Sequence, residues 1–157
     1  MNRPVQDRSQ PLLRLMQLVL QDKRLSAFAT ALDLCNLAGL LDGETDTTAF
    51  APTNVAFARL DDLRLQEWFR DPQVLRQVLL HHLVCGRLEV RDLIRIGTLE
   101  TLGGGKLRIQ ASTDGVSLGA ARIENCDITA RNGVLHLISN VLEPPSPLAP
   151  SSPEIRA

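Results

Sequence analysis

Apolar residues recur at helical spacing in the first part of the chain. Two patterns lie before residue 40, and each repeats apolar positions at i, i+3, i+4 and i+7, the spacing of a helix with one buried face. The members of the two patterns are Leu12, Leu15, Met16, Val19 and Leu20, then Leu25, Phe28, Ala29, Leu32 and Cys35. Each pattern predicts a helix, and Gly39 stands where the second helix is expected to end.

The next apolar stretch changes from strand-like to helical character at a proline. Residues 48–51 predict a short strand, which Pro52 ends because proline has no N–H to donate to a sheet. Either Thr53 or Asn54 then supplies a side-chain oxygen that caps the free amides of a following helix. The apolar contacts of that helix are expected from Val55, Phe57 and Leu60. We refer to residues 52–54 as the hinge.

A further helix is predicted to begin at Asp71, which acts as the cap, with Pro72 in the first turn. Its apolar face is expected to comprise Val74, Leu75, Val78, Leu79 and Leu83. His82 falls near the middle of that face and His81 at its edge. A histidine in such a place is more often a hydrogen-bonded core residue than a ligand or a base, so we expect His82 to be buried.

The second part of the chain alternates apolar and polar residues, which is typical of strands. Residues 107–111 and 116–118 flank the hairpin signal Asp114-Gly115, and Asn132-Gly133 marks a turn before a strand over 134–142. Later strands are expected to contain Ile123 and Ile128. Helices first and strands second predict the α+β class.

The two ends of the chain differ from the rest in composition. Residues 1–10 are polar and are expected to be disordered. The segment "EPPSPLAPSSPEIRA" holds five of the nine prolines, so we expect residues 146–157 to form a disordered tail that packs against nothing. One domain over residues 11–145 remains.

Charge and composition exclude two classes of partner. The chain has 157 residues, enough for one domain with a core, and its formal net charge is −1. Aromatic residues make up 3% and tyrosine is absent, which leaves little surface for base stacking. We therefore expect no nucleic-acid partner, and no membrane insertion because no apolar stretch reaches about 18 residues.

Cysteine usage and the N-terminus suggest a compartment. Cys35, Cys85 and Cys126 are odd in number and far apart, which predicts buried free thiols in a reducing environment. The apolar run near the start is interrupted by Arg14 and Gln17, so no signal peptide is visible. The sequence as given is thus expected to be cytoplasmic, although a trimmed N-terminus or another secretion route would give the same picture.

Motifs for catalysis or metal binding are not found in the sequence. The run "GGGK" at 103–106 predicts a tight turn, because Leu107 stands where a phosphate loop needs Ser or Thr. His81 and His82 are adjacent, so on a helix they diverge by about 100° and cannot both face one zinc ion. His136 receives no role. We expect no enzyme activity, no cofactor and no metal site.

Three separated segments nevertheless form a pattern together. They are "TAFAPTNVAFARL" at Thr48 to Leu60, "VLLHHLVCGRLEVRDL" at Val78 to Leu93, and "NCDITARNGVLHLISNVLEPP" at Asn125 to Pro145. In their order and spacing they resemble the signatures of the fasciclin domain, over about residues 11–145. The chain resembles the short, single-domain microbial members of that family.

The resemblance implies an α+β fold in which a bent β-sandwich or wedge-like β-barrel packs against several helices. It also implies that the hinge is structural, with His82 as the buried polar partner of Thr53 and Asn54. The structural residues implied by the motifs are Pro52, Thr53, Asn54, His82, Gly86 and Gly133.

The resemblance further implies a non-enzymatic interaction or adhesion module that binds a protein or a surface polymer, and a secreted location if the N-terminus is processed. Asp127 and Ile128 match an Asp-Ile pair linked to integrin contacts in some animal members. They are candidate interaction residues together with His81, which stands where the family often has tyrosine or asparagine. The other interpretation of Asp127 is a capping aspartate in a strand. Cys85 stands where the family often has proline.

A second function class stays open at this point. Some fasciclin-like proteins bind apolar pigments or accompany biosynthetic enzymes, and an aliphatic core could open into such a cavity. In that case His82 would be a polar anchor for an apolar small molecule. A pocket that reaches His82 from solvent would favour this class, and a closed core would favour the interaction module.

Overall fold

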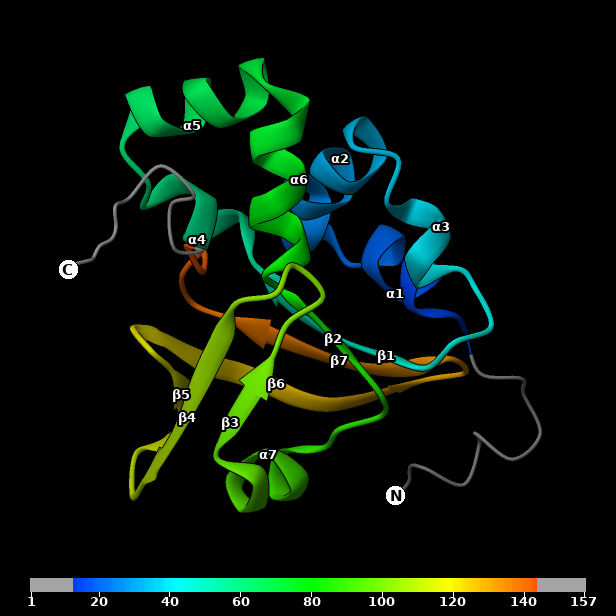
Figure 1. Cartoon of the computed structure of the whole chain (residues 1–157), viewed down its shortest axis with the longest axis vertical. Coiled ribbons are helices and arrows are strands. Elements are labelled where there is room, and N and C mark those ends of the chain that lie inside the picture. Colours follow the sequence, from blue (N-terminus) through cyan, green and yellow to red (C-terminus); the bar gives the residue numbers. More distant parts are fainter. Residues whose placement is uncertain (1–12, 144–157) are drawn as a thin grey trace, which may run out of the picture.

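The computed structural model describes residues 13–143 (Figure 1). The helices are α1 Leu15–Gln21, the 3-10 turn η2 Lys23–Leu25, α2 Ser26–Leu34, α3 Ala38–Leu41, α4 Asn54–Ala58, α5 Asp62–Arg70, α6 Pro72–Leu80 and α7 Val90–Ile96. The strands are β1 Thr47–Pro52, β2 Leu83–Cys85, β3 Thr98–Glu100, β4 Lys106–Ser112, β5 Gly115–Leu118, β6 Ala121–Ala130 and β7 Gly133–Ile138. The disorder expected for 1–10 and 146–157 concerns residues outside the described range.

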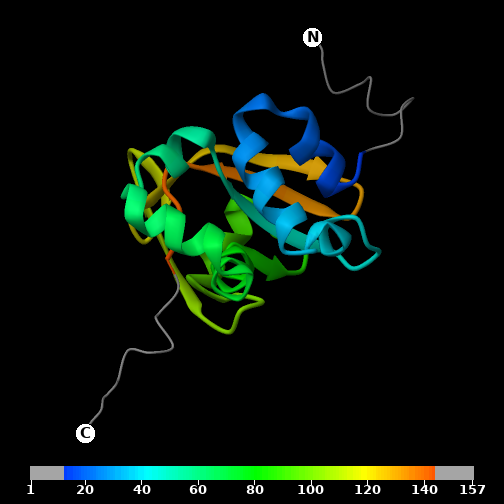
Figure 2. The same ribbon diagram turned by 90° about the horizontal axis from the view of Figure 1, so that it is seen from above.

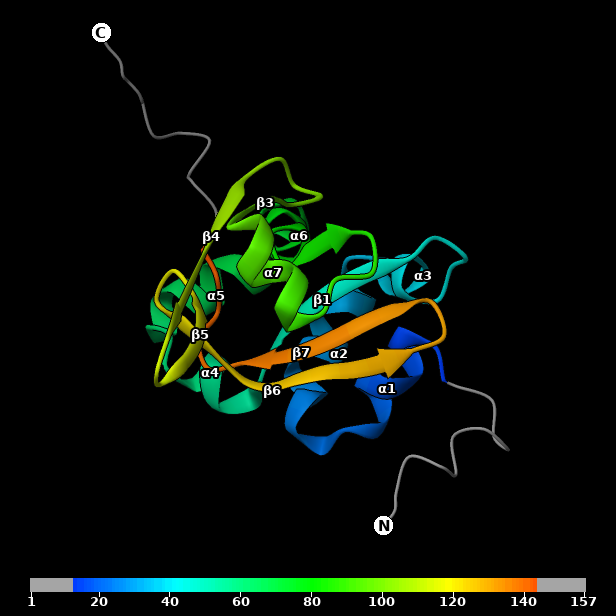
Figure 3. The same cartoon turned by 90° about the horizontal axis from the view of Figure 1, so that it is seen from below.

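The strands form one mixed sheet in the order β2-β1-β7-β6-β5-β4-β3. β1 and β7 run parallel, and the other neighbouring strands run antiparallel. Seen from below, β6 and β7 lie along one side and β4 and β5 turn away from them, so the sheet curls into an almost closed barrel (Figure 3). Helices and a curled antiparallel-rich sheet together confirm the predicted α+β class.

Two apolar clusters lie on opposite faces of β1 and β7. Ala49 and Ala51 of β1 pack with the helices, whereas Phe50 belongs to the cluster inside the barrel. The division follows from strand geometry, since successive side chains point to opposite faces. Figures 1 and 2 show α1 to α6 gathered over one face of these strands, with α7 at the far end. Both faces of β1 are thereby covered, and all six of its residues are buried.

The end of α2 differs from the prediction. Asn36, not Gly39, takes the left-handed conformation that closes the helix, with φ of 58°. The N–H of Leu37 donates to the Leu32 carbonyl at 2.9 Å, and that of Asn36 to the Asp33 carbonyl at 3.1 Å. These two bonds form a Schellman motif, in which asparagine is the usual substitute for glycine. Gly39 lies inside α3 instead.

Several positions predicted to be apolar contacts are exposed. Leu20 is 65% exposed, Val55 61% and Val74 41%. Periodicity indicates a buried face only where a neighbouring element covers that whole face, and these positions lie at uncovered edges of short helices. Leu83 is buried as expected, but in β2, because α6 ends at Leu80.

The cysteine prediction is correct for one residue and wrong for two. Cys35 is buried at the end of α2, whereas Cys85 and Cys126 are exposed free thiols. Cys85 ends β2, which is one of the two edge strands of the sheet. Cys126 lies in the part of β6 where the register with β7 shifts between Asn125 and Ile128. An edge strand and a bulge both leave side chains uncovered, which explains the exposure.

Candidate functional site

The turn between β6 and β7 joins the two layers of the molecule. Asn132 is buried, and its amide oxygen accepts from the Leu15 N–H at 2.9 Å while its amide nitrogen donates to the carbonyls of Leu41 at 2.9 Å and Gly43 at 2.8 Å. Gly133 lies so close to β1 that an added Cβ would stand 1.8 Å from the Thr47 carbonyl oxygen. This turn therefore needs both residues of the Asn-Gly pair.

The hinge positions α4 and fastens it to the N-terminal helices. Thr53 is the N-cap of α4, and its hydroxyl accepts from the Ala56 N–H at 3.3 Å. The Asn54 amide oxygen accepts from the Ala27 N–H at 2.9 Å, and its nitrogen donates to the Lys23 carbonyl at 3.0 Å. Pro52 is the last residue of β1. All three hinge residues thus make contacts within the scaffold.

His82 has a different partner from the one expected. Its ring is fully buried, with Nδ1 2.7 Å from the Val78 carbonyl oxygen and Nε2 accepting from the Leu142 N–H at 2.8 Å. The predicted partnership with Thr53 and Asn54 is wrong, because the ring spans from α6 to the segment after β7. The His82 carbonyl, and not the ring, meets β1, where it accepts from the Phe50 N–H at 2.9 Å.

These contacts fix the ring of His82 in its neutral form. Nδ1 carries the proton that the Val78 carbonyl accepts, and Nε2 is the acceptor. Burial lowers the pKa of His82 to about 3, against the smaller opposing effect of the Val78 carbonyl. The ring of His82 is neutral and fully enclosed, and both of its nitrogens are hydrogen-bonded. His82 is therefore a structural residue.

The loop after β2 depends on glycine at a second motif position. Gly86 has φ of 103°, a conformation that side-chain-bearing residues rarely adopt. Its carbonyl accepts from the Thr48 hydroxyl at 2.7 Å, and the same hydroxyl accepts from the Leu88 N–H at 2.9 Å. Gly86 therefore lets the chain leave the sheet edge while it stays bonded to β1.

Asp127 and Ile128 lie side by side but face different surroundings. Asp127 sits in the β6 bulge with φ of 57°, and its carboxylate accepts from the Val90 N–H at 2.8 Å, at the start of α7. Its side chain is 41% exposed. Ile128 is half-buried and packs against the helix-side core. The pair is thus not displayed as one exposed motif. The Asp127 carboxylate instead accepts a hydrogen bond from the first residue of α7.

His136, for which the sequence motifs predict no role, is a structural residue. Its Nδ1 accepts from the Asp127 N–H at 3.1 Å, and its Nε2 donates to the Leu88 carbonyl at 2.9 Å. The ring stacks on Phe50 at a centroid distance of 5.4 Å. Burial lowers the pKa of His136, although the Leu88 carbonyl and the nearby carboxylates of Asp127 and Glu89 oppose the shift.

His81, the third candidate interaction residue, is not on an open surface. It is the C-cap of α6 and only 4% exposed, and burial lowers its pKa. Its Nδ1 lies 3.4 Å from the Thr101 hydroxyl. A large partner cannot reach His81 without entering the hollow that this residue lines.

Acid is expected to destabilise the protein through these histidines. All three histidines have a lowered pKa in the folded protein. Below the ordinary histidine pKa of about 6.5, the unfolded chain therefore binds more protons than the folded one. The free energy of unfolding thus decreases as the pH is lowered below that value. With a folded-state pKa of about 3, His82 alone accounts for a loss of roughly 2–3 kcal/mol near pH 4.5. Urea melts at about pH 7 and pH 4.5 measure this, and equal midpoints would contradict it.

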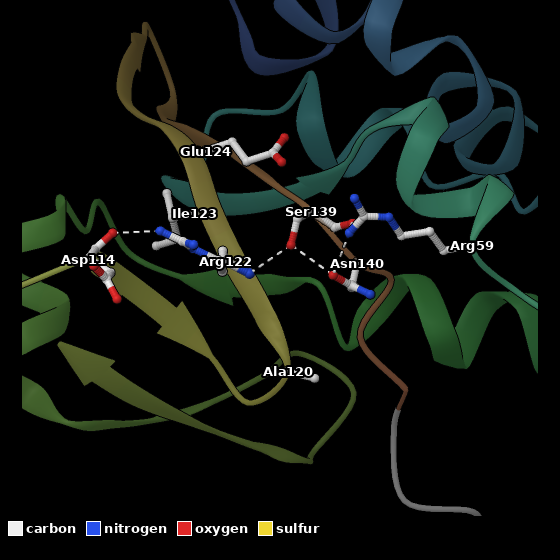
Figure 4. Close-up of a pocket in the computed structure, with 8 residues that line it drawn as sticks. All are labelled: Arg59, Asp114, Ala120, Arg122, Ile123, Glu124, Ser139 and Asn140. Carbon is white, nitrogen blue, oxygen red and sulfur yellow. Dashed lines mark hydrogen bonds between the residues drawn. The ribbon is translucent and has the colours of Figure 1, made fainter. Parts of the chain in front are cut away.

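A polar hollow of about 740 Å³ opens between α4, β6 and the segment after β7 (Figure 4). Its lining comprises Arg59, Asp114, Ala120, Arg122, Ile123, Glu124, Ser139 and Asn140. We refer to it as the arginine hollow. It brings together residues from the hinge helix, a hairpin turn and two neighbouring strand ends, none of which the sequence motifs mark as functional.

Hydrogen bonds hold the two arginines of this hollow in place. Nη1 of Arg59 donates to the Ser139 carbonyl at 3.1 Å and to the Asn140 amide oxygen at 3.2 Å. Nη2 of Arg122 donates to the Asp114 carbonyl at 2.6 Å, and its backbone N–H to the Ser139 hydroxyl at 2.9 Å. Figure 4 shows the two guanidinium groups on opposite sides of Ser139.

The arginine hollow presents hydrogen-bond donors that other groups of the protein leave free within the described residues. A guanidinium has five N–H donors, and the contacts of Arg59 and Arg122 within residues 13–143 occupy one nitrogen of each. The Ser139 hydroxyl donates to the Asn140 amide oxygen at 2.8 Å, and an amide is not a base that could activate this hydroxyl as a nucleophile. The free donors suit carboxylate, phosphate or hydroxyl groups.

Neither a metal-binding cluster nor a membrane-spanning helix is found among the described residues. Across 13–143 no group of three or more His, Cys, Asp or Glu side chains is arranged to hold a metal ion. Over the same range, none of the helices has the length and apolar character needed to cross a membrane.

Comparison with known proteins gives relatives of very different lengths. The chain is 31% identical over 128 residues to the protein sll1735 of the cyanobacterium Synechocystis, which covers 82% of this chain and 96% of that protein. It is 33% identical over 135 residues to human stabilin-1, covering 83% of this chain but only 5% of stabilin-1. The chain thus corresponds to nearly all of the first relative and to a small part of the second.

A solved structure has the same fold. A FAS1 domain pair from the insect cell adhesion molecule fasciclin I superposes with a TM-score of 0.70 at 14% identity, over 84% of this chain and 51% of that one. This confirms the predicted fasciclin-like fold. The family model for the fasciclin domain matches residues 23–144. The chain therefore belongs to the fasciclin domain family, as its three dispersed motifs predict.

Proposed function

We propose that this protein is a non-enzymatic binding module, and that the arginine hollow is where it holds a protein or a surface polymer. The observation that carries the proposal is the pair of positioned guanidinium groups, Arg59 and Arg122, which keep free donors among residues 13–143. Membership of a family that includes an insect cell adhesion molecule supports an adhesion-type role.

The charges of the hollow favour a partner that carries both acidic and neutral polar groups. Arg59 and Arg122 offer fork-shaped donors that match carboxylates. Glu124 adds an acceptor for hydroxyl or amide N–H groups, and the Asn140 amide nitrogen adds donors, because its oxygen already accepts from Arg59 and Ser139. An acidic polysaccharide and an acidic peptide segment both present this combination. The hollow is thus suited to a polar chain rather than to an apolar one.

Exposed residues of β6 extend this surface. Residues 124–127 follow Arg122 along the strand and are exposed, and the bulge at this point turns them away from the regular ladder. Arg24 reaches across from η2 and donates to the Asn125 amide oxygen at 3.1 Å. A partner held in the arginine hollow could continue along this row, where Asp127 is the last exposed member.

The function implies a location outside the cell, which we propose for the mature protein. A matrix- or surface-binding module meets its partner there, and the fasciclin resemblance points the same way. The compartment is tested by fractionating cells of the native host and sequencing the N-terminus of the recovered protein by mass spectrometry. Recovery from the cytoplasm with an unprocessed N-terminus would contradict this location.

The structure gives no support to an apolar ligand anchored on His82. Both nitrogens of that ring are bonded to backbone groups, the ring is fully enclosed, and the described hollows have other linings. A ligand would have to displace the Leu142 N–H to reach it. The interaction module is therefore the function that we propose for this chain.

Removal of both arginines from the hollow is expected to weaken binding. The double variant Arg59→Gln/Arg122→Gln should bind the acidic polymer extracted from the host surface about ten-fold or more weakly than wild type, since charge-assisted bonds are lost. Biolayer interferometry on immobilised polymer measures the affinity. The matched control is Arg91→Gln/Arg95→Gln on α7, whose side chains are 84% and 76% exposed.

Each outcome of this comparison has a definite meaning. Equal weakening in both double variants would show that bulk charge, and not the hollow, holds the polymer. Wild-type binding that is lost only in the Arg59/Arg122 variant supports the proposal, provided that urea melts show the variant to be folded. Unchanged affinity in that variant would overturn it.

A further inference from the structure

A second hollow lies apart from the hinge, between the end of α6, the start of β4 and the segment after β7. Its volume is about 450 Å³, within the range of small-molecule sites. Its lining includes buried apolar residues from β4, β5 and the segment after β7, namely Leu107, Leu118, Val141 and Leu142. We refer to it as the His81 hollow, because His81 is the one ionisable residue in its lining that is buried.

His81 has an unsatisfied nitrogen. Its Nδ1 faces the Thr101 hydroxyl at 3.4 Å, and that hydroxyl also accepts from the Gly105 N–H at 3.1 Å. Its Nε2 has no hydrogen-bond partner within residues 13–143, whereas His82 and His136 each bond through both nitrogens. A buried polar atom without a partner is rare in proteins, so this one calls for a ligand group or water.

The rim of the His81 hollow carries positive charge. Lys106 and Arg108 are exposed, and neither has a carboxylate within 4.0 Å in the described part of the chain. Glu143 also lines the hollow, but its carboxylate is paired with Arg64. The cations are thus available to a ligand, and the one acid at the rim is already partly neutralised.

We propose that the His81 hollow binds a small amphipathic carboxylate. The apolar body of the ligand lies against Val141 and Leu142, and its carboxylate meets Lys106 and Arg108, with His81 Nε2 bonded to an oxygen of the same head group. This site and ligand class are separate from the polar polymer assigned to the arginine hollow. The protein thereby has a small-molecule site beside its partner-binding surface.

Sodium octanoate is the probe that tests this, with octanamide as its uncharged counterpart. In the full chain, octanoate is expected to shift the His81 ring signals in NMR, assigned with His81→Gln, while the His136 signals stay in place. Isothermal titration calorimetry should give an affinity about ten-fold weaker for Lys106→Gln/Arg108→Gln and unchanged for the control Arg91→Gln/Arg95→Gln. Octanamide should bind at least about ten-fold more weakly than octanoate.

Four results would overturn the proposal. Octanamide binding as tightly as octanoate would show that the cations play no part. Equal affinities in the two double variants would place the acid elsewhere. Octanoate binding that is seen only after removal of residues 144–157 would make the C-terminal segment the occupant of the hollow. Self-association of the chain would appear in sedimentation as a mass that depends on concentration. If self-association shields His81, so that octanoate does not shift its NMR signals, the occupant of the hollow is a second copy of the chain.

Discussion

Replacement of Gly133 by alanine is expected to lower the free energy of unfolding by at least about 3 kcal/mol. The new Cβ would stand 1.8 Å from the Thr47 carbonyl oxygen and 2.9 Å from Cδ1 of Leu15. Relief requires the parallel pair of β1 and β7 to move apart, and that pair separates the two apolar clusters. Urea denaturation followed by circular dichroism measures the loss.

The matched control is Gly39→Ala. Gly39 lies inside α3, an added Cβ there meets nothing within 4 Å, and alanine favours a helix by up to about 1 kcal/mol over glycine. We therefore expect Gly39→Ala to leave the midpoint unchanged or to raise it. If the two variants melt at the same urea concentration, the close approach of Gly133 to β1 is not a constraint on the fold.

The second large effect is expected for His82→Ala, at about 3 kcal/mol. The substitution removes the acceptor of the buried Leu142 N–H and leaves a cavity where the ring stood. The same substitution at His81 should cost less than half as much, because that ring has one contact of 3.4 Å and borders a hollow. Urea melts of both single variants at about pH 7 provide the comparison.

The His82 result also separates scaffold from site. A lowered midpoint with unchanged polymer affinity at temperatures where the variant is folded fits a ring that is structural. An unchanged midpoint combined with lost binding would mean that His82 belongs to an open functional site, contrary to its enclosure between α6 and the segment after β7.

Local sequence signals predicted much of the scaffold. The cap at Thr53, the Asp71-Pro72 helix start and the Asn-Gly turn at 132–133 each depend on residues that are neighbours in the chain, so their physics is readable from the sequence. The order of helices and strands was sufficient for the α+β class. The three dispersed motifs led to the family because they report the same fold in three places.

Contacts between distant residues could not be predicted in this way. His82 was correctly placed in the core, but its partner Leu142 lies sixty positions further along and offers only a backbone N–H, which no side-chain pattern reveals. The same holds for Asn132, whose amide joins Leu15 to the end of α3. The signal in the sequence is an asparagine directly before a turn glycine, and it predicts the turn but not these distant contacts.

The candidate site was the least predictable part. Arg59 and Arg122 are separated by more than sixty residues and are typical surface arginines in their local sequence, so only the fold brings them into one hollow. The Asp127-Ile128 pair, by contrast, is marked by the motif, yet the bulge in β6 directs Asp127 to the start of α7 and Ile128 to the core.

The most direct test of the proposed function is the footprint of the bound polymer on the protein. Amide hydrogen exchange of the full chain, with and without saturating host-surface polymer, locates the contact. We predict added protection at the start of α4 through Arg59, along β6 from Arg122 to Asp127, and at Ser139 and Asn140, with the α6 end unchanged. Protection confined to α7 or to the edge of β2, or none at all, would contradict the account of this protein as a module that binds through the arginine hollow.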